Sequence, residues 1–152
     1  MGVMKAFYLT SALISLIALS SCKKIEAPQF KNVEGFKIKS LGLKETKVGF
    51  NVTFYNPNDF GIHVKEAVSD IYIDSVYAGK FVQDEEVDVS KNSNFSIPLT
   101  GSIPLAVALK LDLTQLVNKD LLFKANGSVK IGKAGVFITK PFNYQGVHQI
   151  KL

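Results

Sequence analysis

The sequence predicts a mainly β fold, a seven-stranded antiparallel β-sandwich with one amphipathic helix. Two observations predict it: apolar and polar residues alternate in several segments from residue 36 onward, and one stretch instead shows apolar spacings of three and four. The composition, 47% hydrophobic and 20% charged, is that of a globular chain. A length of 152 residues suits one domain.

Alternation identifies four strands, each with one buried and one exposed face. A short strand begins at Phe36 and Ile38, and longer strands cover residues 48–54, 95–103 and 123–131. Pro98 has no N–H to donate, so we expect it at a sheet edge or at a bulge. Lysines gather near the first strand, as is typical of an edge: Lys37, Lys39, Lys44 and Lys47.

The segment 62–73 predicts a strand with an irregularity. Its apolar residues fall on even numbers up to Val68 and on odd numbers from Ile71. A change of phase within one strand requires an extra residue, so we expect a bulge near Ser69 and Asp70.

Short turns connect the remaining strands. Asp74–Ser75 is predicted to be a two-residue hairpin turn before a strand over residues 76–82. Residues 132–135 contain two glycines and should turn the chain into a last strand over 136–144.

Residues 104–119 predict the one helix. Pro104 suits a first helical turn, and Lys119 suits the negative end of the helix dipole. We expect this helix to cover an end or an edge of the sandwich. Between the two sheets we expect apolar side chains to interlock fully and to leave no reactive group inside.

The first 22 residues predict export and lipid attachment. Lys5 precedes 16 uncharged residues, 6–21, a run that is short for a bilayer span and has the length of a signal-peptide core. The run ends in Leu-Ser-Ser-Cys, which resembles the bacterial lipobox, and Cys22 is the only cysteine. The resemblance implies that residues 1–21 are removed and that Cys22 carries acyl chains such as palmitate, which together anchor stably. A removed signal peptide that merely contains a cysteine is the alternative.

Residues 22–34 are predicted to be a tether between the lipid anchor and a domain over 35–152, because they are polar and do not alternate. We therefore expect an exported domain at the bacterial cell envelope, attached to a membrane. Some bacteria use an acidic residue after the lipobox cysteine as a retention signal. By resemblance to those systems, Lys23 favours the outer membrane.

Residues 51–58, which end in Asn56, Pro57 and Asn58, resemble the WHy domain of late-embryogenesis-abundant (LEA) type 2 proteins, and so does the hairpin that follows. The later strand, helix and strand follow in that family's order. The resemblance implies a fibronectin type III/immunoglobulin-like sandwich and a role in desiccation or other stress, without established catalysis. The residues themselves indicate a structural motif, because proline ends a strand ladder and asparagine caps turns. Contact with a ligand is the alternative.

Nucleotide and nucleic-acid binding are not indicated. Residues 127–134 nearly match a phosphate-binding P-loop, but Ala134 has no hydroxyl for magnesium, and the spacer alternates as a strand does. All 18 basic residues are lysines, so the chain lacks the planar guanidinium fork that suits bidentate phosphate recognition. An exported address also argues against nucleic acid as a partner.

Catalytic and metal-binding patterns are missing as well. His63 and His148 lie on different predicted strands, have no cysteine partner in the mature domain, and are expected at the surface or rim. The densest acidic cluster contains no glycine bend, which favours a solvated loop over a calcium site: Asp84, Glu85, Glu86 and Asp88. We therefore expect no enzyme activity, no cofactor and no metal.

Two functions remain. The first is a non-catalytic, lipid-anchored envelope protein that protects against desiccation or other stress. The alternative is an interaction module that docks an envelope protein through a sheet edge or the helix face. An enzyme would need a deep polar pocket with perturbed ionisable groups, and no pattern in the sequence indicates one. We expect a monomer.

Overall fold

The computed structural model describes residues 24–112 and 115–150. The predicted signal peptide and Cys22 lie outside the described residues. Within those residues, the chain forms eight strands and one helix: β1 (Gln29–Leu41), β2 (Glu45–Tyr55), β3 (Ile62–Ile73), β4 (Val76–Gln83), β5 (Val87–Val89), β6 (Asn94–Pro104), α2 (Leu105–Leu111), β7 (Asp120–Lys133) and β8 (Val136–Gln149). The prediction of a mainly β chain with a helix is confirmed.

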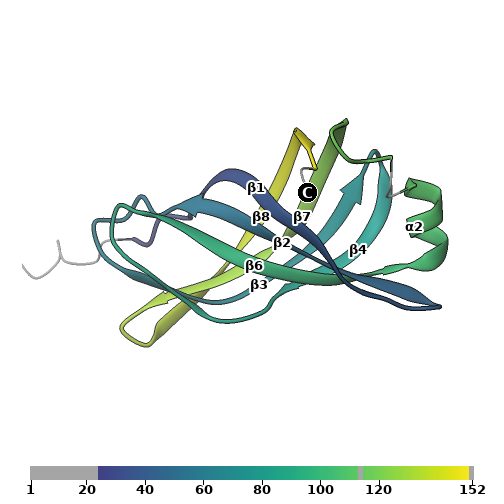
Figure 1. Cartoon of the computed structure of the whole chain (residues 1–152). Helices are drawn as coiled ribbons and strands as arrows, with labels where there is room; N and C mark the ends of the chain where they lie inside the picture. The colour runs from purple at the N-terminus through teal and green to yellow at the C-terminus, as the bar shows by residue number, and fades with distance from the viewer. Residues whose placement is uncertain (1–23, 113–114, 151–152) are drawn as a thin grey trace, which may run out of the picture.

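The strands form one antiparallel sheet in the order β1-β2-β6-β4-β3-β7-β8, with β5 beside β3. The sheet curls into a half-barrel, so that β1, β2 and β6 lie across from β3, β7 and β8 (Figure 1). These two halves join at a seam, which we define as the pairing of β4 residues 81–83 with β6 residues 99–101. The two layers expected from the sequence are therefore parts of one hydrogen-bonded sheet.

The strands with the clearest alternation form as predicted. The segments 48–54, 95–103 and 123–131 lie within β2, β6 and β7. The turn at Asp74–Ser75 is confirmed, and both residues have the positive φ (47° and 68°) that a type I′ turn requires. Ala134 and Gly135, with φ of 51° and 81°, form the second predicted turn, so the near match to a P-loop is a strand and its hairpin.

At Pro98, β6 pairs with β2 on one side but with no strand on its other side, as at a sheet edge. β6 pairs with β2 along its length, but its pairing with β4 begins only at Leu99. The Pro98 carbonyl accepts a hydrogen bond from the Asp84 N–H, and the missing proline N–H interrupts none of the residue pairs between β6 and β4.

The irregularity in β3 lies earlier than predicted. The register of β3 against β7 shifts between Val64 and Glu66, not near residues 69–70. Ala67 is already on the buried face, whereas Val68 is only half-buried. The sequence pattern places the bulge too late in the strand because Val68, an apolar residue, lies on the outer face.

The acidic cluster is only partly the solvated loop that the sequence predicts. Val87–Val89 forms β5, which pairs with the start of β3, and Val89 is buried. Only two valines flank Asp88, so the alternation is too short to be recognised in the sequence.

The helix α2 is about half as long as predicted. It covers Leu105–Leu111, with Pro104 as its N-cap rather than in its first turn. Asp112 adopts the left-handed conformation, with φ of 45°, and ends the helix. Leu116 is buried independently of the helix. Apolar spacing beyond residue 112 therefore reflects contacts of the following segment with the core.

The first strand is longer than predicted, and part of the predicted tether belongs to the sheet. β1 begins at Gln29, so residues 29–34 pair with β2. Its register against β2 shifts at three points. These irregularities, together with the exposed side of an edge strand, explain why this segment shows no sustained alternation.

Candidate functional site

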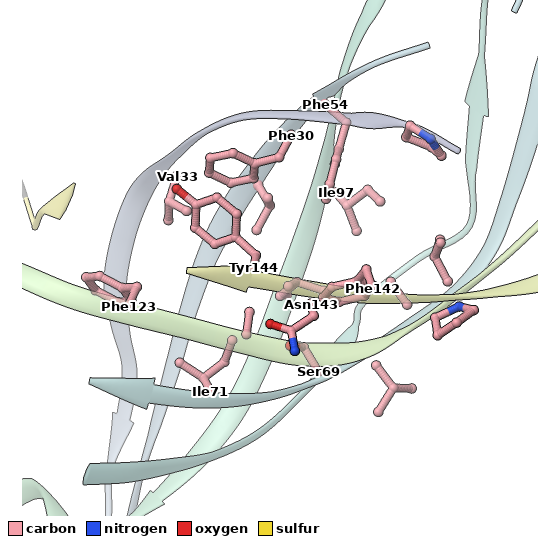
Figure 2. A pocket seen from close by; sticks show the side chains of 18 of the residues that line it. Phe30, Val33, Phe54, Ser69, Ile71, Ile97, Phe123, Phe142, Asn143 and Tyr144 are labelled. Carbon is pink, nitrogen blue, oxygen red and sulfur yellow. The ribbon is translucent and has the colours of Figure 1, made fainter. Parts of the chain in front are cut away.

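The inner face of the half-barrel encloses an apolar cavity of about 240 Å³ (Figure 2). Six strands contribute alternate side chains to it, because residues two apart share one face of a strand. The main apolar lining is Phe30 and Val33 from β1, Phe50, Val52 and Phe54 from β2, Ile97 and Leu99 from β6, Ile71 from β3, Phe123 and Val129 from β7, and Phe142 and Tyr144 from β8. The expectation that the interior is completely filled is wrong at this place.

Small residues on β3 and β7 explain the cavity. Ala67 pairs with Val129, Ser69 with Gly127, and Ile71 with Ala125. Residues directly opposite in an antiparallel pair lie on the same face, so these small side chains form one floor. A methyl group at Gly127 would come within 2.0 Å of the Val68 carbonyl oxygen, so the two strands approach too closely for a larger residue there.

Aromatic rings close the open side of the half-barrel, between β1 and β8. Among the described residues, these two edge strands make no ladder with each other. The ring centroids of Phe30 and Tyr144 lie 4.1 Å apart, and Figure 2 shows the two rings side by side. His148 lies against Phe30, Phe123 and Tyr144, and its Nε2 shares a hydrogen bond with the Tyr144 hydroxyl. Burial in this cluster raises the pKa of Tyr144.

A second cavity, of about 520 Å³, continues the first along the same open side. It lies beside the middle of β1 and the end of β8, and its lining includes His148 and Gln149. The two cavities share four lining residues: Val33, Phe50, Ile71 and Phe123. The space between the halves is therefore elongated along β1 and β8.

Few polar groups reach the first cavity. The Ser69 side chain is buried, and its hydroxyl has acceptors only at 3.5 Å, the carbonyls of Asp70 and Asn126. Lys124 and Lys140 also line it. A site of this composition excludes water and holds apolar groups, with little capacity for proton transfer.

Asn56, Pro57 and Asn58 lie in the connection between β2 and β3, outside the cavity lining. Asn56 is fully buried, and its Nδ2 donates to the carbonyls of Phe60 and Ser90, each at 3.0 Å. Its Oδ1 accepts from the N–H (3.0 Å) and the Nδ2 (2.8 Å) of Asn58.

Asn58 in turn holds the segment that precedes β1. Its Oδ1 accepts from the Glu26 N–H at 2.8 Å, and its Nδ2 donates to the Glu26 carbonyl at 2.9 Å. These two bonds, which we call the Asn58 clamp, place Ala27 and Pro28 at the cavity, whose lining includes both. The motif thus has a structural role in the described residues.

The two histidines lie on different strands, as predicted, and at opposite ends of the strand between them: His63 pairs with Gly132 and His148 with Leu121 of β7. His63 lies on β3 between two carboxylates, 2.6 Å from Asp88 through Nδ1 and 2.7 Å from Glu86 through Nε2. Hydrogen bonds to Asp88 and then Glu86 raise the pKa of His63. Sequence reasoning missed this group because it treated β5 as loop.

The other acidic residues of the cluster serve different contacts. Lys39 donates to Asp84 at 2.7 Å and thereby ties the edge strand β1 to the end of β4. Burial acts to raise the pKa of Asp84, but its hydrogen bonds with Lys39 and Thr100 outweigh burial, so the net pKa is lowered. Within residues 24–112 and 115–150, no group of three or more His, Cys, Asp or Glu residues is arranged so that it could hold a metal ion.

The cavity itself was not predicted from the sequence. Its one signal is the series of small residues within strands: Ala67, Ser69, Ala125 and Gly127.

In the described part of the chain, no helix is long and apolar enough to cross a bilayer.

Comparison with known proteins finds a relative in sequence. The chain is 32% identical over 121 residues to the uncharacterized protein MJ1138 of Methanocaldococcus jannaschii, and the match covers 76% of this chain and 68% of that protein. The chain belongs to the MJ1138 family. No family model matches it.

Solved structures share the fold of this MJ1138-family chain. A crystal structure of a protein from Archaeoglobus fulgidus has a TM-score of 0.50 at 13% identity, over 82% of this chain and 99% of that one. The solution structure of AT1g01470 from Arabidopsis thaliana has a TM-score of 0.52 at 15% identity, over 87% of each chain. At these identities the likeness concerns the fold alone.

Proposed function

We propose that this protein is a non-catalytic binding module that holds an apolar molecule between the two halves of its sheet, at the bacterial cell envelope. The observation that carries the proposal is the cavity between the halves, lined by aromatic and aliphatic side chains. Transfer of an apolar ligand from water into such a site is favourable by about 25 cal/mol per Å² of apolar surface buried. Ligand sites typically combine such a lining with few polar groups.

Filling the cavity tests this function. Ala125 lies on the cavity floor, opposite Ile71 and Tyr144, so Ala125→Leu should take up part of the space. We expect the full chain to bind the neutral dye Nile red and the variant to bind it about tenfold more weakly, equivalent to about 1.4 kcal/mol. Ala106→Leu, at an exposed position on α2, is the matched control. Equal binding by all three proteins would contradict the proposal.

We further propose that Cys22 carries the lipid that attaches the protein to a membrane, with the outer membrane favoured. The Asn58 clamp supports a close attachment, because it holds Glu26, four residues after Cys22, against the domain. The intact mass of the membrane-extracted protein should correspond to residues 22–152 plus acyl chains. Cys22→Ala should lose both the acyl mass and the membrane association; an unmodified cysteine in the mature protein would disprove the anchor.

Protection against desiccation or other stress is the second candidate function, supported by the resemblance of residues 51–58 to the LEA type 2 family. In that reading, the two halves correspond to the layers of a fibronectin type III-like sandwich. A deletion strain should survive drying, osmotic shock or freezing less well than its parent. Unchanged survival in all three would exclude this role. Docking of an envelope protein remains the alternative, and crosslinking in intact cells should then capture one stoichiometric partner.

A further inference from the structure

We propose that the ligand is an amphiphile with one acyl chain in the cavity and an anionic head group at Lys140, an inference that rests on the proposed binding function. Lys140 pairs with Val129, whose side chain packs against the core and lines the cavity. Directly opposite residues share a face, so Lys140 lies on the inner face of β8. Along that face its neighbours are Ile138 and Phe142, two residues away on either side.

The charge of Lys140 is uncompensated among the described residues, because none of their carboxylates lies within 4.0 Å of it. The residue is half-buried in an otherwise apolar lining. Lys124 differs: it pairs with Tyr72 and Gln145, on the face of β7 opposite to Phe123 and Ala125. A partly buried cation beside an apolar cavity favours an anionic group that accepts a charged hydrogen bond.

The position of Lys140 also sets the direction of the ligand. Lys140 precedes Tyr144 by four residues, or about 13 Å along a strand. The cavity lining also includes Ala27 and Pro28, which follow the Asn58 clamp. An acyl chain with its head group at Lys140 would extend past Phe30 and Tyr144 toward the second cavity, which shares Phe123 with the first.

An inward lysine on an edge strand has a second physical explanation, because such charges prevent pairing between sheet edges. That role requires no ligand and no preference for a charged head group. The two explanations therefore differ in what Lys140→Met does to ligand selectivity.

The test uses the full chain made by cell-free synthesis without membranes, so that it meets no lipid. Fluorescence titrations compare cis-parinaric acid with its methyl ester at about pH 8, where a carboxyl group is ionised. We expect the wild type to bind the acid about fivefold more tightly than the ester, a difference typical of one partly exposed ion pair. Lys140→Met keeps the aliphatic stem and should abolish the preference, whereas Lys140→Arg should keep it.

Lys130→Met is the matched control, since Lys130 pairs with Thr139 on the outer face of the same two strands. A preference for the acid that survives in Lys140→Met, or that the wild type lacks, would overturn the head-group proposal and leave apolar binding intact. If the wild type unfolds cooperatively on heating but binds neither probe, the binding function is overturned as well.

Competition distinguishes two sources of the same chemistry. Displacement of the probe by oleate alone assigns the site to free fatty acids. Displacement by vesicles of phosphatidylglycerol, but not of phosphatidylcholine, assigns it to an anionic membrane lipid. If none of these competitors displaces the probe, the probe does not report on an acyl-chain site, and the proposal is wrong.

Discussion

At the scale of single residues, Asn58 connects the N-terminal segment to the domain. Its two hydrogen bonds to Glu26 span 32 positions of sequence. Asn58→Ala should destabilise the fold by about 1–3 kcal/mol, because it removes these bonds and leaves a buried acceptor of Asn56 with fewer donors. Hydrogen exchange at the Glu26 amide should also accelerate.

The control for this prediction is Asn126→Ala, at an exposed position on β7. It should change the free energy of unfolding by less than about 0.5 kcal/mol. An unchanged exchange rate at Glu26 in Asn58→Ala would show that the clamp does not hold the segment in solution.

His63 makes the fold sensitive to pH. Its pKa is raised in the folded state by Asp88 and Glu86, so the folded state binds the proton more tightly than the unfolded state does. This contribution to stability is fully present below the unfolded pKa of about 6.5 and is lost as the pH rises through the folded pKa. As the pH rises through the folded pKa, the urea midpoint of unfolding should therefore fall more steeply for the wild type than for His63→Gln. Parallel curves for the two proteins would contradict the prediction.

At the scale of elements, the seam between β4 and β6 is the weakest join in the sheet path, with three residue pairs. The Phe81 ring lies over Gly101, and a Cβ at Gly101 would come within 2.7 Å of that ring and 2.8 Å of the Lys80 carbonyl oxygen. Gly101→Ala should therefore destabilise the protein by about 1–3 kcal/mol. Ser102→Ala, at the next residue on the opposite face, should have a much smaller effect in the same denaturant titration.

The accuracy of prediction from sequence followed the length of each pattern. β2 and β6 alternate over at least seven residues, so their strands were predictable. β5 has three residues and contains Asp88, which is too short a pattern to outweigh an acidic loop. The predicted helix is longer than α2 because Asp112 ends the helix through its backbone conformation, which apolar spacing does not encode.

At the scale of the whole molecule, the cavity depends on register between distant segments. Ala67, Ser69, Ala125 and Gly127 are unremarkable in sequence, and they form a floor only because β3 and β7 pair in one register. The Asn motif was predictable as structural, but its partner Glu26 was not, since nothing local links the two. Likewise, only the pairing of Lys140 with Val129 shows that this lysine lies on the inner face of β8.

A ligand in the cavity should stabilise the whole fold by mass action. At a free ligand concentration 100 times the dissociation constant, the gain is about 2.7 kcal/mol. Thermal unfolding of the full chain with an apolar ligand should show a higher midpoint, and Ala125→Leu should reduce the shift. A midpoint that rises equally in both proteins would indicate binding elsewhere on the surface.

The absence of a ladder between β1 and β8, among the described strands, has a mechanical consequence. We expect that the two halves can separate about the seam, because such a movement would part the Phe30 and Tyr144 rings without breaking a ladder between β1 and β8. Such an opening would admit ligands of different width, so selectivity for the width of the ligand would be low even where selectivity for its charge is high.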